Sequence, residues 1–166
     1  MNQLPPSSNR FTPMGKMQQA PAGASILAPV NAGTRMVMNF VSLGPSKFDQ
    51  KLDKMLERIW NKVRQDYFSW SGEIMNFKLG NIKDTLVNSD IMILSLLVRN
   101  KEGIVDAAAL EKALQKLAAF AKYEKGSIHV SELLVEEVPA LKELIKKHIA
   151  ETGIHCYFYD APPDKK

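Results

Sequence analysis

Few residues of this 166-residue chain are suited to disulfide or metal chemistry. The single cysteine excludes an internal disulfide framework and a zinc site built from cysteines. Cys156 alternates with Ile154 and Phe158, which predicts a buried core thiol. The three histidines do not form a spaced ligand set, although His129 and His155 fall on predicted strands that can be neighbours. We therefore expect no metal site.

Long apolar runs and the common catalytic motifs are also missing. Charged residues interrupt every long hydrophobic stretch, which excludes a membrane span and predicts a soluble, intracellular protein. There is no Gly-x-Ser-x-Gly nucleophile elbow, no Gly-x-x-x-x-Gly-Lys phosphate loop and no Gly-x-Gly-x-x-Gly run. The sequence thus identifies no catalytic residue and no cofactor.

Acidic residues are absent from the first 48 positions, which carry Arg10, Lys16, Arg35 and Lys47. These four account for the whole net charge of +4, because removing them from the 22 basic residues leaves 18, equal to the 18 acidic ones. The excess positive charge belongs to the N-terminal segment and forms no basic face on one element. This distribution argues against a nucleic-acid partner.

The N-terminal segment over residues 1–33 is rich in Pro, Gln, Ser, Ala, Gly and Met and poor in groups that build a core. Because burial there offsets little of the entropy of ordering, we expect a flexible or extended arm. Residues 26–30 are a candidate edge strand, where a proline is tolerated. An arm that orders against a protein partner and an organelle transit peptide are the alternatives.

Regular elements become legible after this arm, since no proline occurs between Ser46 and Val138. Hydrophobic alternation and apolar runs predict strands at 36–42, 73–79, 90–98, 127–131 and 154–159. Helical periodicity and capping residues predict helices that begin near Ser46, Asp106 and Pro139. Gly126 fits the position just after the second helix.

The order of these elements is β-α-β-β-α-β-α-β. Strands that alternate with helices predict an α/β fold, a three-layer α/β/α sandwich around a mostly parallel mixed sheet. We expect the arm over residues 1–33, a folded domain over 34–160 and a polar tail over 161–166.

Two stretches at the predicted carboxyl ends of strands are candidate binding sites. Ser42, Gly44, Ser46 and Lys47 belong to the connection between the first strand and the first helix, where Ser46 can also be a plain helix cap. Arg99 ends the central strand, at the edge where open α/β sheets bind ligands, and can contact an anion. An ordinary polar loop is the alternative for both stretches.

The second half of the chain resembles the closing half of a macro domain. The likeness rests on residues 90–98, 109–114, 127–131, 144–149 and 153–159. It covers roughly residues 36–160 and is greatest to the divergent branch that contains the macro module of a poly-ADP-ribose-regulated chromatin remodeller and a small ADP-ribosyl-acceptor hydrolase. A weaker resemblance is to the N-terminal domain of leucyl aminopeptidases, whose metal-binding catalytic domain has no counterpart here.

The resemblance implies an ADP-ribose site made of two glycine-rich loops whose N–H groups surround the diphosphate. The first loop corresponds to residues 42–47, where Gly44 remains but Pro45 lacks a donor. The second follows Ser131, which this correspondence makes the sixth candidate ligand-binding residue. Residues 132–138 contain no glycine and three carboxylates. Glu136 or Glu137 is a candidate general base, with stabilisation of the following helix N-terminus as the alternative.

Aromatic residues gather near the end of the first predicted helix, namely Trp60, Tyr67, Phe68 and Trp70. Exposed, they would suit a protein contact; buried, they would cover the sheet. Together with the arm, they lead to the hypothesis of a degenerate macro-like domain that is a non-catalytic binding or structural module in a protein assembly. An ADP-ribose-binding module or ADP-ribosyl hydrolase is the alternative.

Overall fold

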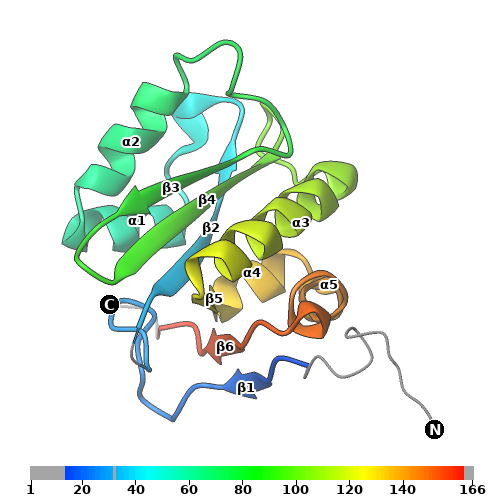
Figure 1. Cartoon of the computed structure of the whole chain (residues 1–166). Helices are drawn as coiled ribbons and strands as arrows, with labels where there is room; N and C mark the ends of the chain where they lie inside the picture. Colours follow the sequence, from blue (N-terminus) through cyan, green and yellow to red (C-terminus); the bar gives the residue numbers. More distant parts are fainter. Residues whose placement is uncertain (1–13, 32, 163–166) are drawn as a thin grey trace, which may run out of the picture.

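A six-stranded mixed sheet is the centre of the computed structural model, which describes residues 14–31 and 33–162 (Figure 1). The strand order is β1-β6-β5-β2-β4-β3. The strands are β1 (Met17–Gln19), β2 (Arg35–Ser42), β3 (Ile82–Leu86), β4 (Ile91–Arg99), β5 (Ser127–Ser131) and β6 (Cys156–Tyr159). Neighbouring strands are parallel except β3 and β4, which confirms the predicted mostly parallel mixed sheet.

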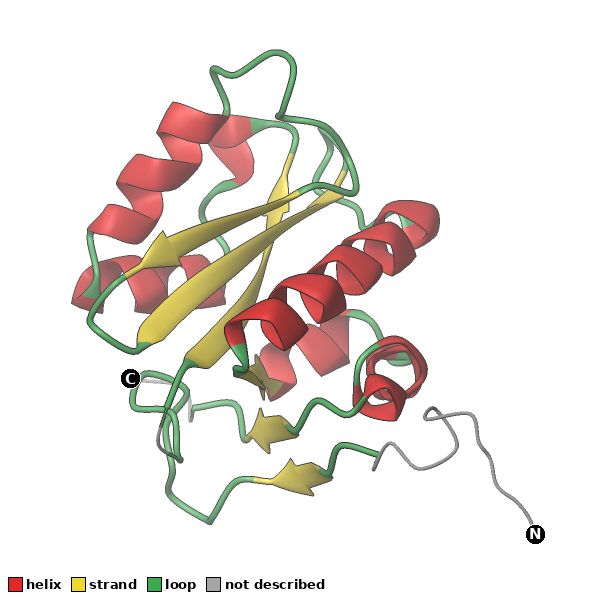
Figure 2. Ribbon diagram, viewed as in Figure 1, coloured by secondary structure: helices red, strands yellow, loops and turns green. Residues whose placement is uncertain are grey.

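Helices cover both faces of this sheet, as the predicted three-layer sandwich requires (Figure 2). On one face lie α1 (Lys51–Ile59) and α2 (Lys62–Trp70). On the other lie α3 (Ala107–Glu124), α4 (Glu132–Glu137) and α5 (Leu141–His148). Short 3-10 turns are η2 (Pro45–Lys47) and η3 (Ala150–Thr152). None of the helices in the described ranges has the length and apolar character needed to cross a bilayer.

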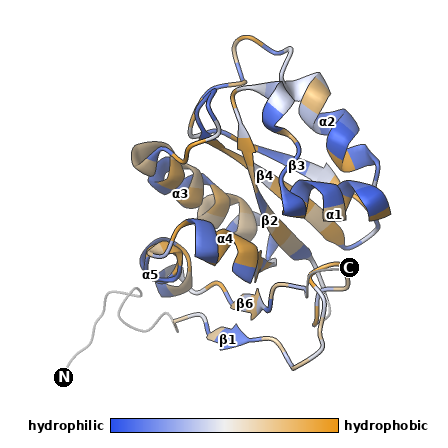
Figure 3. Cartoon of the chain, turned by 180° about the vertical axis from the view of Figure 1, so that it is seen from behind, coloured by the Kyte–Doolittle hydropathy of each residue, from blue (hydrophilic) through white to orange (hydrophobic). Residues whose placement is uncertain are grey.

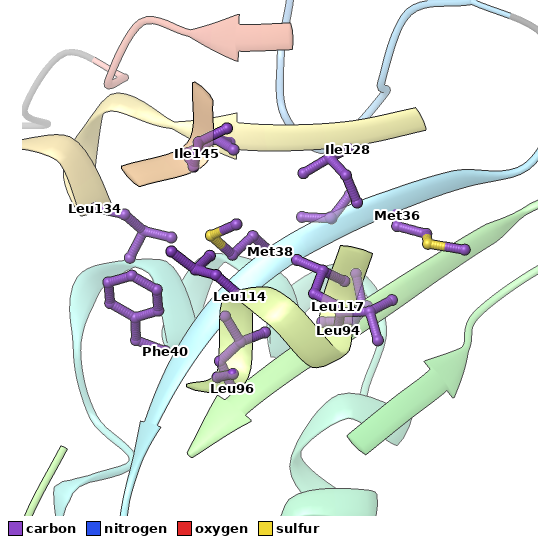
Figure 4. Packing of buried hydrophobic residues seen from close by; sticks show 14 of the residues in the cluster. Met36, Met38, Phe40, Leu94, Leu96, Leu114, Leu117, Ile128, Leu134 and Ile145 are labelled. Carbon is purple, nitrogen blue, oxygen red and sulfur yellow. The ribbon is translucent and has the colours of Figure 1, made fainter. Parts of the chain in front are cut away.

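The core lies between the sheet and the helix layers. Met36, Met38 and Phe40 alternate along β2 and meet the buried side of α3, which includes Leu114 and Leu117 (Figure 4). The outer sides of α1 and α2 are hydrophilic, whereas β2 is hydrophobic along most of its length (Figure 3). Burial of alternate strand residues against an amphipathic helix is the main favourable term in such a fold.

The predicted strands at 36–42, 90–98, 127–131 and 154–159 are confirmed as β2, β4, β5 and β6 to within two residues. The predicted strand at 73–79 is wrong, because these residues form turns and the next strand is β3. The ring of Phe77 packs edge-on against Tyr67 and Trp70, with centroids 5.9 and 5.2 Å apart. Phe77 thus packs onto α2, whereas Ile74 and Met75 are exposed, so the apolar residues of this segment do not form one face of a strand.

The helix predicted from Ser46 is divided in the structure, and an unpredicted helix precedes the one predicted near Pro139. Instead of one helix from Ser46, the chain forms η2, then α1 and α2, because Gln50 and Asp53 make a capping box that begins α1 at Lys51. The helix predicted near Pro139 is confirmed as α5, and the chain also forms α4, which was not predicted, directly after β5. The hydroxyl of Ser131 accepts from the N–H of Leu133, 3.1 Å away, and caps α4.

The predicted cap of α3 is confirmed, since the carboxylate of Asp106 accepts from the N–H of Ala109 at 2.8 Å. At the other end, Lys125 and not Gly126 takes the left-handed conformation, with φ 57°. Gly126 follows it, and its N–H bonds to the carbonyl of Ala121. Gly126 itself is confined by packing, because a Cβ atom there would lie 2.9 Å from the side chain of Met36.

Part of the predicted arm is an edge strand of the sheet. Met17–Gln19 forms β1 parallel to β6, and the N–H of Ala20 donates to the carbonyl of Phe158 at 2.8 Å. The edge strand predicted at 26–30 is wrong, because these residues form turns and bends whose Ile26 is buried in the core. Residues 1–13 of the predicted arm and 163–166 of the predicted tail lie outside the described residues.

A buried polar network fastens the end of this segment to β5 and β6. The hydroxyl of Tyr159 accepts from the N–H of Val30 at 2.8 Å and bonds Nδ1 of His129 at 2.7 Å. Nε2 of His129 bonds the hydroxyl of Ser127 at 2.7 Å, and the imidazole stacks on Tyr157 with centroids 5.0 Å apart. We call His129, Tyr157 and Tyr159, with their bonds to Val30 and Asn31, the tyrosine clasp.

The clasp makes the stability of the fold depend on pH. Burial lowers the pKa of His129 from 6.5 to about 3. The unfolded chain therefore binds a proton below pH 6.5 that the folded chain rejects, and the clasp loses stability on acidification. As the pH falls from 6.5 to 4, we expect the free energy of unfolding of the wild type to decrease by about 1.4 kcal/mol per pH unit relative to that of His129→Gln.

Urea unfolding of both proteins across this pH range measures the effect, with the exposed His155→Gln variant as the matched control. A wild-type curve that runs parallel to that of His129→Gln would contradict the neutral, buried imidazole.

Candidate functional site

The carboxyl ends of three parallel strands meet at one edge of the sheet. β2 ends at Ser42, β4 at Arg99 and β5 at Ser131, and Ser42 is paired with Arg99. β2 and β5 pair only from Arg35 with Ser127 to Val37 with His129, so the two strands diverge toward this edge. The connections of β2 and β5 leave in opposite directions, which makes the gap between them the place where α/β sheets bind ligands.

Arg99 is buried at this edge, and each of its three side-chain nitrogens donates a hydrogen bond. Its Nε and NH2 groups donate to Oε2 and Oε1 of Glu137 at 2.8 and 2.7 Å, and its NH1 group donates to the carbonyl of Phe40 at 2.7 Å. Arg99 is 3% exposed and Glu137, at the end of α4, is 30% exposed. The cation predicted to contact an anion is thus paired with an anion of the chain itself.

A hollow of about 400 Å³ opens beside this ion pair. Its walls come from the start of α1 and from α4, and its lining residues are Gln50, Lys51, Leu52, Arg99, Leu133, Leu134, Glu136 and Glu137. Glu136 and Glu137 bring two carboxylates to it. The sequence offered two roles for Glu137, a general base or an acid at the N-terminus of the following helix. In the structure Glu137 ends α4 and pairs with Arg99.

The loop after β2 is shaped by the protein around it. Gly44 approaches the next loop so closely that a Cβ atom there would lie 2.9 Å from the carbonyl oxygen of Lys101. The N–H of Lys47 donates to the carbonyl of Gly44 at 2.9 Å and closes η2, while Ser46 and Lys47 are exposed. Gly44 thus satisfies a packing requirement.

Ser42 and Ser131 are both buried at the strand ends. The carbonyl of Ser42 accepts from the hydroxyl of Tyr67 at 2.5 Å, and its own hydroxyl is buried with no hydrogen-bond partner in the described structure. The hydroxyl of Ser131 is used to cap α4. Of the six predicted site residues, Arg99 lines the hollow and the other five do not, although they belong to the ends of β2 and β5 and the loop after β2.

A buried carboxyl beside Arg99 is the component that sequence reasoning missed. Asp53 of α1 is 1% exposed and accepts from Nδ2 of Asn39 at 2.8 Å and from the N–H of Gln50 at 3.1 Å. Burial raises the pKa of Asp53 to about 6, against the opposing effects of the Asn39 bond and the Arg99 charge. The signal was present in the sequence: Asn39 interrupts an apolar strand, and Asp53 lies beside Leu52 on an apolar helix face.

Histidine and cysteine contribute nothing to this edge. Both ring nitrogens of His129 are bonded within the clasp, and Nδ1 of His155 accepts from the N–H of Lys16, so the two histidines do not form the conceivable pair. No group of three potential metal ligands occurs in the described ranges. Cys156 is fully buried, and burial raises its pKa to about 12, which confirms the predicted core thiol.

The aromatic group near α2 is mainly core. Tyr67 and Trp70 are buried and Trp60 is half-buried, so Tyr67 and Trp70 cannot form the predicted contact surface. The ring of Tyr67 stacks on Phe48 with centroids 4.8 Å apart. Phe68 is the exposed member of the group, at 37%.

Comparison with known proteins finds relatives only through structure, since no family model and no curated protein matches the chain. A macrodomain protein from Streptomyces coelicolor is 18% identical, with a TM-score of 0.76 over 89% of this chain and 99% of that one. A protein of unknown function from Bacteroides thetaiotaomicron is 15% identical, with a TM-score of 0.79 over the same shares. The macrodomain of Mycobacterium tuberculosis DarG is 14% identical, with a TM-score of 0.66 over 90% of this chain and 99% of that one.

These structures define the fold class: the chain is an α/β domain of the macrodomain fold. This confirms the resemblance seen in the sequence. At identities of 14–18% it is a divergent example, whose function follows from its own residues.

Asp53 predicts a second pH dependence, opposite in sign to that of His129. Its folded-state pKa of about 6 lies above the ordinary 3.8, so between these values the folded chain binds more protons and loses stability as the pH rises. As the pH rises from 4 to 6, we expect the free energy of unfolding of Asp53→Asn to increase relative to that of the wild type by about 1.4 kcal/mol per pH unit. Urea unfolding at several pH values tests this, with the exposed Asp84→Asn variant as control. A difference that does not change with pH would show that Asp53 titrates normally.

Proposed function

We propose that the chain is a non-catalytic, macro-like module that takes part in a protein assembly. The observation that carries this proposal is the ion pair between Arg99 and Glu137 at the gap between β2 and β5. A diphosphate that entered the gap would meet the carboxylates of Glu136 and Glu137, where repulsion between like charges opposes its binding.

The groups around the gap also support a role without catalysis. Pro45 has no N–H to offer, and Gly44 is engaged by the loop at Lys101. Asp53, the one carboxyl here whose pKa is raised toward neutrality, is buried and directs its oxygens at Asn39 and at its own helix. A general base must reach a substrate proton, and this carboxyl is turned inward.

The contact surface that we assign to a protein partner lies beside the buried aromatic group. Phe68 of α2 and Ile74 and Met75 of the loop after it are 37, 87 and 76% exposed. Exposed apolar side chains that lie next to one another mark interaction surfaces, and Ile74 and Met75 are neighbours in one turn. We call these three residues the loop surface; it replaces Tyr67 and Trp70 as the contact region, and the arm remains part of the proposal.

ADP-ribose binding is the second candidate. The specific observation in its favour is the hollow of about 400 Å³ at the strand edge of a macrodomain fold, next to a guanidinium. ADP-ribose could reach Arg99 only if the Glu137 side chain moved away from the guanidinium.

Isothermal titration of the full chain with ADP-ribose separates the two candidates. Under our proposal the wild type shows no binding heat at ligand concentrations up to about 1 mM, because Glu137 holds the cation. The paired variants Ser46→Glu and Ser89→Glu place the same charge on exposed residues at opposite ends of the sheet. Micromolar binding that Ser46→Glu weakens and Ser89→Glu preserves would establish the nucleotide site and overturn the proposal.

Affinity purification of the tagged chain from its host tests the protein contact. We expect a stoichiometric partner that the double variant Ile74→Ser, Met75→Ser loses, because the loop surface supplies apolar contact area. Leu86→Ser is the matched control, since Leu86 is 47% exposed at the other end of β3. The contribution of the arm is tested by a deletion of residues 1–13, because a longer deletion would remove β1. Retention of the partner by the double variant and by this deletion would contradict the assignment.

A further inference from the structure

Arg99 presents the arrangement with which arginine binds oxyanions. Two neighbouring donors, Nε and NH2, hold the two oxygens of one carboxylate at 2.8 and 2.7 Å, and the carbonyl of Phe40 fixes the third donor, NH1. This planar fork fits any carboxylate or phosphate group that offers two oxygens side by side. The guanidinium is 3% exposed, so its charge is poorly screened by water.

The carboxylate in this fork belongs to a small element. α4 has six residues; Leu134 is buried, Leu133 and Val135 pack partly buried against the core, and Glu136 is exposed. Glu137 is the last residue of the helix and precedes the turn through Val138 and Pro139. Its side chain is 30% exposed, and the ion pair with Arg99 holds it in place.

Space for a different anion exists next to the pair. The hollow of about 400 Å³ borders both Arg99 and Glu137, and Leu52, Leu133 and Leu134 supply its apolar walls. A group that enters the hollow reaches the guanidinium once the Glu137 side chain swings toward solvent. Arg99 would keep its bond to Phe40 during this exchange and remain in place.

We infer that Arg99 is the anchor of an oxyanion site and that Glu137 is its resident anion, which a carboxylate or phosphate group of a ligand displaces. The inference rests on the closed site described under the proposed function and names the class of ligand that opens it. In the wild type the displacing group belongs to a protein partner, whose contacts outside the hollow offset the repulsion by Glu136 and Glu137 that excludes a free nucleotide. A partner without such a group leaves α4 in place.

The decisive comparison is between Glu137→Ala and the matched variant Glu136→Ala, each titrated with sodium phosphate or acetate. Sodium chloride at equal ionic strength is the reference. We expect Glu137→Ala to lose thermal stability, because a buried guanidinium is left unpaired, and to recover it with phosphate or acetate and not with chloride. Glu136→Ala keeps the ion pair and should respond as the wild type does.

Nuclear magnetic resonance of the Arg99 side-chain Nε–H group locates the bound anion. Phosphate should shift this signal in Glu137→Ala with an affinity roughly tenfold or more above that of the wild type, because the competing carboxylate is gone. The combined Arg99→Met and Glu137→Ala changes should abolish the effect. If Glu137→Ala does not fold, Glu137→Gln supplies the same comparison with the charge removed and one acceptor oxygen retained.

Equal responses of the Glu137 and Glu136 variants to phosphate, or no shift of the Arg99 signal, would overturn the inference. Either result leaves the proposed function untouched, since that function fails only if the wild type binds ADP-ribose or lacks a protein partner.

Discussion

A cation buried at the end of a parallel sheet constrains everything around it. Because an unpaired guanidinium in the interior costs several kcal/mol, Arg99 requires an anion, and the chain supplies Glu137. To bring Glu137 there, the chain turns into α4 directly after β5, with Ser131 as its cap. α4 in turn closes the gap where β2 and β5 separate. The geometry of the edge thus follows from the pairing of one buried charge.

The half of the sheet formed by β5 and β6 is covered differently from the half formed by β2, β4 and β3. α1 and α2 cover β2, β3 and β4 on their face, whereas the segment before β2 covers β5 and β6 and is fixed by the tyrosine clasp. A loop segment buries less apolar area than a helix, so hydrogen bonds and the stacked His129 ring contribute more of the attachment here. On this face, apolar burial holds α1 and α2 on β2, β3 and β4, whereas a polar network holds the N-terminal segment on β5 and β6.

The sequence predicted those parts of the fold whose signals are local. Continuous apolar runs identified β2 and β4, and Asp106 marked the start of α3, because strand burial and helix capping depend on neighbouring residues. The edge that carries Arg99 followed from topology. The Arg99–Glu137 pair could not be predicted, since its partners are 38 residues apart and meet only once α4 has formed. The false strand at 73–79 arose because its apolar residues have unrelated environments: Phe77 packs on α2, whereas Ile74 and Met75 are exposed in a turn.

One consequence concerns the intrinsic fluorescence of the protein. Both tryptophans, Trp60 and Trp70, belong to the α1–α2 half, while Tyr157 and Tyr159 lie in the half covered by the N-terminal segment. Tryptophan emission therefore reports on the α1–α2 layer and not on the attachment of the N-terminal segment. Tyrosine absorbance reports on both halves, because Tyr67 lies in α2, so the tryptophan signal is the one that isolates the helical layer in an unlabelled sample.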